Sequence, residues 1–165
     1  MTTFQSSLAQ QIVTAKLADS PVAPQGDYNS RAADKFIVRT DRAVLAAVAE
    51  LAQAHGRSVN AELVAALLDG LCNHSPSQTL LDILKAHLGS KADQVLAGVE
   101  TFDINLSGKQ QFIIRLPDSV RQQIEVTAGL GSMNRWAARM VAVWVNTQRQ
   151  CDALLSACML NQVSE

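Results

Sequence analysis

Two short segments of the chain combine hydrogen-bond donors with an alternating pattern. They read KFIVRT at residues 35–40 and QFIIRL at residues 111–116. Because side chains alternate across a strand, one face of each segment carries two polar or charged residues around an isoleucine. These residues are Lys35, Ile37 and Arg39 in the first segment and Gln111, Ile113 and Arg115 in the second. Arg and Lys can donate to guanine, and Gln can bind adenine through two hydrogen bonds. Paired as a ribbon, the two strands would present one row of side chains at a width that fits a DNA major groove.

The sequence contains no recognisable set of catalytic or metal-binding residues. There is no Ser/His/Asp, Cys/His or paired-carboxylate arrangement in a familiar context, and no glycine-rich phosphate loop. The cysteines and histidines do not have metal-like spacing. They are Cys72, Cys151 and Cys158, and His55, His74 and His87. We therefore expect no enzyme activity, no metal and no cofactor, and we expect the cysteines to be reduced thiols.

Each segment is followed by two stretches with helical periodicity. In the first copy, Thr40 or Asp41 can cap a helix that buries Val44 and Val48, and His55-Gly56 can end it. Ser58 then begins a second helix with an apolar stripe. In the second copy, a turn at 129–132 separates a helix after Pro117 from a long helix that we expect to continue toward the C-terminus. One copy of this order is too short to bury its own apolar faces, so two copies should pair.

The predicted fold is therefore mainly α with a short β-ribbon, built from two strand–helix–helix repeats. The boundaries that we predict are a flexible N-terminal arm at 1–33, repeat 1 at 34–73, a helical spacer at 74–108 and repeat 2 at 109–165. The stretch 101–106 also alternates and could form a hairpin with the second strand. The sequence leaves open whether the ribbon forms within one chain or between two chains.

Charge is distributed unevenly along the 165 residues. The net charge is −1, yet residues 109–149 hold six cations and two anions. A footprint for phosphate would therefore lie mainly in the second repeat. No apolar run approaches the roughly 18 residues that a membrane span needs, and the N-terminus lacks the pattern of a secretion signal. We expect a protein of the cytoplasm with no membrane partner.

These motifs resemble the ribbon-helix-helix DNA-binding superfamily, which includes the Arc, Mnt and MetJ repressors. The first copy resembles Arc through FIVRT and GRSVNAE at 56–62, and the second is similar through FIIRLPDSV and SMNRWAARMV. Two copies in one chain are similar to the TraY-type tandem proteins. The resemblance covers about half of the chain, and it implies a double-stranded DNA partner bound by a homodimer or by a pseudo-dimer within one chain.

The resemblance also assigns roles to residues. Base-reading positions are Lys35, Ile37, Arg39, Gln111, Ile113 and Arg115, and phosphate-binding positions at the second helix of each repeat are Ser58, Val59, Asn60, Ser132, Met133 and Asn134. The two isoleucines stand where the family has a polar residue. They could contact thymine methyl groups or be covered by protein. Arg57 and Glu62 match two members of the buried Arg–Glu–Arg cluster described for Arc. Because Ala66 stands at the third position, only a pair is expected.

The function that these features predict is a sequence-specific transcriptional regulator, a repressor encoded on a plasmid, phage or similar element and associated with the nucleoid. Because the reader positions differ between repeats, its site should be an imperfect inverted repeat or a direct repeat. One alternative is a relaxosome or partition accessory protein that binds an origin. Another is a protein-interaction module such as an antitoxin.

Overall fold

A computed structural model describes residues 34–104 and 110–162, with helices as the main element. The N-terminal arm predicted for 1–33 lies outside the described residues. In chain order the elements are β1 (Asp34–Thr40), α2 (Arg42–Ala54), α3 (Val59–Leu71), α4 (Pro76–Leu88), α5 (Ser90–Leu96), β2 (Gln110–Leu116), α6 (Asp118–Ala128) and α7 (Met133–Gln162). We call β1, α2 and α3 the first unit, and β2, α6 and α7 the second unit. Both have the strand–helix–helix order that the sequence predicts.

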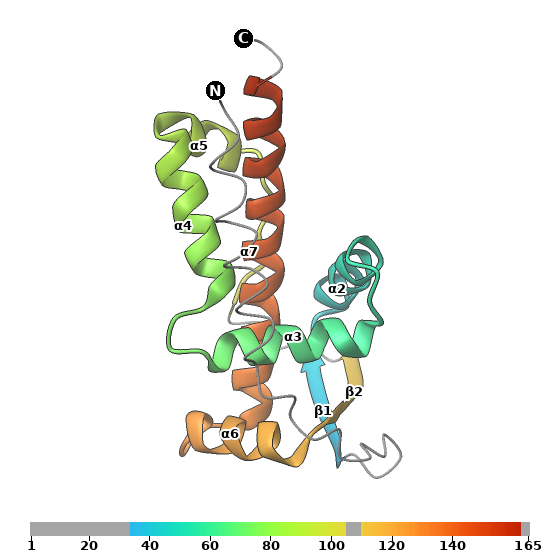
Figure 1. The fold of residues 1–165 in the computed structure, drawn as a ribbon. Helices are drawn as coiled ribbons and strands as arrows, with labels where there is room; N and C mark the ends of the chain where they lie inside the picture. Colours follow the sequence, from blue (N-terminus) through green and yellow to red (C-terminus); the bar gives the residue numbers. More distant parts are fainter. Residues whose placement is uncertain (1–33, 105–109, 163–165) are drawn as a thin grey trace, which may run out of the picture. The chain divides into compact units, whose positions relative to one another are not determined.

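The two strands pair with each other as an antiparallel ribbon within one chain (Figure 1). The register places Ile37 opposite Ile113, so the isoleucine pair marks the centre of the ribbon. The described part of the stretch after α5, which ends at residue 104, does not pair with β2. Instead, the Asn146 side chain in α7 accepts from the Phe102 N–H at 2.8 Å and donates to the Phe102 carbonyl at 2.9 Å. The alternative hairpin is therefore not formed by the described part of the 101–106 stretch.

The ribbon lies on the helices through its apolar face. Val38, Ile114 and Leu116 are fully buried, and Phe36 and Phe112 pack against the same core. The helices contribute the other side of this core with Val44, Val48, Leu63, Leu67, Val141 and Val145. Because α3 and α7 contact each other as well as the ribbon, each unit covers apolar surface that the other leaves open.

Local capping fixes where the helices begin. Asp41 accepts a hydrogen bond from the Ala43 N–H at 2.7 Å, and Ser58 accepts from the Ala61 N–H at 3.2 Å. Between them the chain reverses at Gly56, whose φ of 64° favours glycine. These contacts direct the N-terminus of α3 toward the ribbon, where it becomes part of the candidate nucleic-acid interface.

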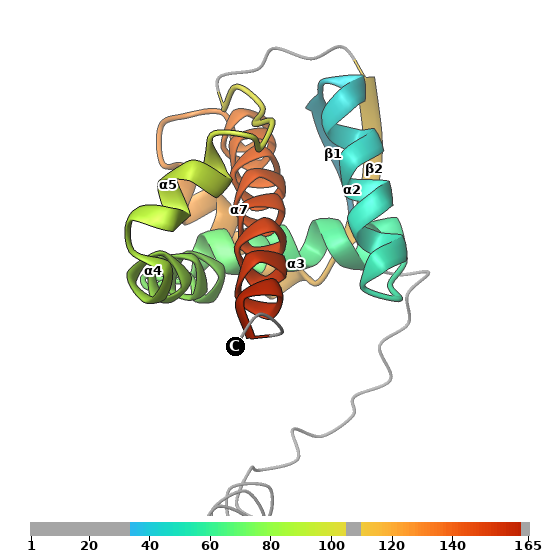
Figure 2. The same ribbon diagram turned by 90° about the horizontal axis from the view of Figure 1, so that it is seen from above.

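The segment predicted as a spacer forms a packed helical hairpin. Helices α4 and α5 lie against the C-terminal half of α7, on the side away from α2 (Figure 2). They enclose a second core made of Leu81, Leu84, Ala92, Cys151 and Leu154. Asp69 at the end of α3 fixes the start of this hairpin, since its carboxylate accepts from the Ser75 hydroxyl at 2.6 Å and the Ser77 N–H at 3.1 Å.

Candidate nucleic-acid interface

Six side chains form what we call the outward row, on the face of the ribbon opposite the core. They are Lys35, Ile37 and Arg39 of β1 and Gln111, Ile113 and Arg115 of β2, and all six are exposed. Ile37 is 39% exposed and Ile113 is 56% exposed. Both isoleucines are therefore only partly covered by the described residues and remain accessible to a partner.

Hydrogen bonds at the ribbon's edges reveal how the outward row is spaced. The Arg39 N–H donates to Asn134 Oδ1 at 2.7 Å, and the Arg115 N–H donates to Asn60 Oδ1 at 2.9 Å. Both N–H groups therefore point away from the partner strand. In an antiparallel pair such residues belong to the non-hydrogen-bonded positions, whose Cα atoms are only about 4.5 Å apart. Since these positions recur at every second residue, the whole outward row consists of closely spaced pairs.

The register defines three pairs with different chemistry. Lys35 faces Arg115 at one end, Ile37 faces Ile113 in the middle, and Arg39 faces Gln111 at the other end. The first pair places two cations opposite each other, and like charges in directly opposed positions destabilise a ribbon. The last pair combines a cation with an uncharged amide. The row thus offers donors at both ends and an apolar centre.

The two asparagine contacts cross between the units. Asn60, at the start of α3 in the first unit, holds the strand of the second unit, and Asn134, at the start of α7, holds the strand of the first. We call them the crossed asparagine bonds. They bring one helix N-terminus to each edge of the ribbon. The resemblance assigns the backbone N–H groups of both asparagines to phosphate, and their side-chain oxygens are used within the protein.

The backbone at these helix starts still has free donors. Ser58 caps α3, and Ser132 Oγ accepts from the Arg135 N–H at 3.4 Å in α7. The preceding N–H groups, those of Val59 and Asn60 and of Met133 and Asn134, have no acceptor within their helices. They lie at the positive ends of the helix dipoles, which suit an anion. All six residues predicted to bind phosphate therefore lie at the two helix starts that flank the outward row.

Comparisons with known proteins identify the first unit, not the second. Residues 30–79 match the family described as Arc-like DNA binding domain. Residues 30–79 are an Arc-like DNA-binding domain. The transcription factor AmrZ of Pseudomonas ogarae is 45% identical over 47 residues, which cover 28% of this chain and 44% of that relative. The chain thus spans less than half of the relative's length. No solved structure matches the chain significantly.

The Arc-like domain contains a fully buried carboxylate, Glu62. Its oxygens accept from Trp144 Nε1 at 2.8 Å, contact His55 Nδ1 at 3.0 Å and lie 3.5 Å from Arg57 Nη1. The Arg57–Glu62 pair expected from the sequence is therefore present, and Glu62 has two partners besides it. The additional partners are His55, at the end of α2, and Trp144, from the second unit. Helical spacing gives no sign that the indole N–H of Trp144, 82 residues farther along the chain, would reach Glu62.

More positive side chains lie near the start of α7 than near the start of α3. Arg135 and Arg139 are exposed in the first two turns of α7, whereas the first turn of α3 carries Glu62. The buried carboxylate is held by cationic and donor groups. The cation next to the start of α3, Arg57, lies beside Glu62, so an anion there would meet mainly backbone N–H groups, whereas one at α7 would also find two exposed arginines.

Other features of the described residues do not form a second site. Among them, no group of three or more His, Cys, Asp or Glu side chains is placed to hold a metal ion. No helix in this part of the chain is both long and apolar enough to cross a membrane.

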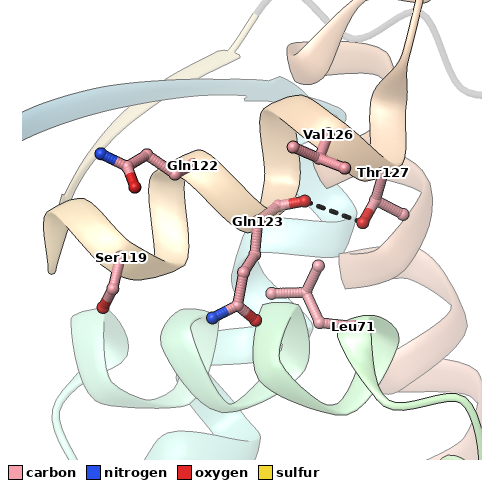
Figure 3. Close-up of a pocket in the computed structure, with 6 residues that line it drawn as sticks. All are labelled: Leu71, Ser119, Gln122, Gln123, Val126 and Thr127. Atoms are coloured by element: carbon pink, nitrogen blue, oxygen red, sulfur yellow. Dashed lines mark hydrogen bonds between the residues drawn. The ribbon is translucent and has the colours of Figure 1, made fainter.

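An open hollow of about 430 Å³ lies between the end of α3 and α6 (Figure 3). Its lining is uncharged: Leu71, Ser119, Gln122, Gln123, Val126 and Thr127. Cys151 is buried, and desolvation raises the pKa of its thiol, with the nearby Asp152 charge adding to the effect.

Proposed function

We propose that this protein is a sequence-specific DNA-binding transcriptional regulator that acts as a repressor and has no catalytic role. The observation that carries the proposal is the outward row, an exposed set of donors on a two-stranded ribbon with a helix N-terminus at each edge. The Arc-like domain and the similarity to a transcription factor support it. Its place of action would be nucleoid DNA in the cytoplasm.

In the proposed complex, the ribbon enters the major groove and the helices remain outside. Arg39, Arg115 and Lys35 donate to guanine O6 and N7, and Gln111 pairs with adenine. The starts of α3 and α7 bind the phosphates on the two sides of the groove. Such phosphate contacts fix the position of the ribbon without reading sequence. The second unit would act as the partner that a single Arc-like domain needs, so one chain would form a pseudo-dimer.

The test is selection of bound sequences from a random DNA library, followed by affinity measurements at several salt concentrations. Replacing Arg39 and Arg115 by alanine should remove roughly 1–3 kcal/mol of base discrimination for each arginine and leave the fold intact. The matched control is Lys85→Ala with Lys91→Ala, which removes two cations from the α4–α5 hairpin. Unchanged operator affinity in the double arginine variant, or no selected sequence, would overturn the proposal.

Two alternative functions predict different results in the same cells. A relaxosome or partition accessory protein would use the same ribbon, but its footprint would lie near a nick site or origin and not over a promoter. A protein-interaction module such as an antitoxin is favoured by exposed apolar side chains around the second core, among them Ile83 at 60% and Met159 at 69% exposure. A stoichiometric partner that purifies with the chain, together with no retention on DNA, would support that role.

A further inference from the structure

We propose that one chain binds a DNA inverted repeat with thymine at its centre. The two arms of this repeat differ from each other at a single position. This inference rests on the proposed function and names its DNA target. The antiparallel register, which relates the strands by a twofold rotation about the Ile37–Ile113 pair, is the reason to expect an inverted repeat and not a direct one.

The outward row has the length of a short base-pair core. From Lys35 to Arg39 the strand advances four residues, about 13 Å at ~3.3 Å per residue. Successive phosphates of one DNA strand are ~3.4 Å apart along the axis. The row therefore spans about four base-pair steps. The isoleucine pair would lie over the central bases, and each polar pair would lie about two base pairs away on either side.

The centre of the row selects against G·C pairs. Ile37 and Ile113 have no donor or acceptor in their side chains, and their β-branched geometry leaves them little freedom to turn aside. The thymine methyl is the apolar group that base edges present in the major groove. Both A·T and G·C pairs also present two acceptors and an amino group in this groove, so the methyl group is what distinguishes them for an apolar side chain. The isoleucine pair therefore favours thymine at the centre.

Each end of the outward row carries one base-reading arginine. The second base-reading residue differs between the two ends. The twofold rotation exchanges Arg39 with Arg115, so both arms should carry a guanine at that position. It also exchanges Lys35 with Gln111, and these residues prefer different bases. The arm beneath Lys35 and Arg115 should hold a second guanine, whose acceptors would also relieve the repulsion between the two cations. The arm beneath Arg39 and Gln111 should hold an adenine.

Two symmetric variants test this assignment. Gln111→Lys should convert the selected sequence into a perfect inverted repeat with guanine in both arms. Lys35→Gln should give the perfect repeat with adenine in both arms. Each variant should bind its own repeat roughly 30- to 20,000-fold more tightly than the other one, the range expected for two good base contacts, one in each arm. Both substitutions are on the exposed face, and thermal melting checks that the fold is retained.

Thymine-to-uracil replacement tests the centre, because it removes the C5-methyl and leaves pairing unchanged. We expect the native chain to lose about fourfold in affinity for each central methyl, and the Ile37→Ala, Ile113→Ala variant to be insensitive. A perfect inverted repeat selected by the native chain, or equal affinity for thymine and uracil, would overturn the inference while leaving DNA binding in place. Failure to select any sequence would instead overturn the proposed function, and the inference with it.

Discussion

The two strand–helix–helix units have the same backbone order but different interiors. Both place an asparagine at the start of their second helix to hold the other unit's strand. The first unit buries Glu62, whereas the matching position of the second unit is Trp136, which packs against the apolar core. The second unit also extends its last helix to 30 residues, against 13 for α3.

This difference shows that the units are complementary and not simply duplicated. The second unit has no equivalent of the buried carboxylate, but its Trp144 satisfies the carboxylate of the first. Close packing supports the same view, since a Cβ added at Gly70 of α3 would lie 2.5 Å from Met140 Sδ of α7. Neither unit can therefore be expected to fold alone. The following experiments test how far each unit depends on the other, from the largest expected effect to the smallest.

The largest effect should come from Glu62, because its removal affects both units. Glu62→Ala would leave Arg57 and the Trp144 indole N–H without their acceptor and would open a cavity. We expect a loss of about 3–5 kcal/mol in the free energy of unfolding, measured by chemical denaturation. Glu125→Ala is the control, since Glu125 is exposed on α6 and such changes usually stay within about 0.5 kcal/mol. Equal stability of the two variants would show that Glu62 does not join the units.

The crossed asparagine bonds should have an intermediate effect that appears in the opposite unit. Asn60→Ala should cost about 1 kcal/mol and speed hydrogen exchange at the Arg115 amide. Asn134→Ala should do the same at the Arg39 amide, and exchange by NMR would resolve the two sites. Asn73→Ala, in an exposed loop, is the matched control. Faster exchange within the altered unit alone would contradict the crossed arrangement.

A smaller effect of opposite sign is expected at the charged end of the outward row. Lys35→Gln removes the repulsion with Arg115, so it should raise the free energy of unfolding by about 0.2–1 kcal/mol while weakening binding to the native operator. Arg39→Gln should bring no such gain, because Arg39 faces the uncharged Gln111. Thermal melts of both variants at low salt make this comparison. A gain in both variants, or in neither, would argue against pairwise repulsion.

The smallest effect concerns two thiols, one at the end of α3 and one within α7. Cys72 is exposed where α3 ends, whereas Cys151 is buried where α7 continues into the second core. Because burial raises the pKa of Cys151, its reactive thiolate should be scarcer. Maleimide should therefore label Cys72 first under native conditions, and labelling of Cys151 should follow unfolding, as mass spectrometry can show. Equal labelling rates in the folded protein would mean that the second core opens readily.

Local patterns account for much of what was predicted. The alternation of FIVRT and FIIRL correctly placed six side chains on one exposed face, because strand periodicity is a property of the backbone. Ser58, as a helix-capping residue, likewise predicted where α3 begins. The partners of Glu62 could not be found from spacing, because His55 and Trp144 reach it from other helices and Trp144 is 82 residues away. The packing of α4 and α5 on α7 was also missed, since an apolar face does not state what will cover it.

The sequence by itself determined which residues alternate, where helices begin and which segment carries the Arc-like domain. Each of these depends on neighbours within a few residues, so the chain's own geometry fixes them. Only the tertiary structure decided that the ribbon closes within one chain, that Ile37 meets Ile113 and that each unit's asparagine holds the other unit's strand. Those contacts join segments far apart in the chain, and they are selected by which apolar faces and buried polar groups can be satisfied together.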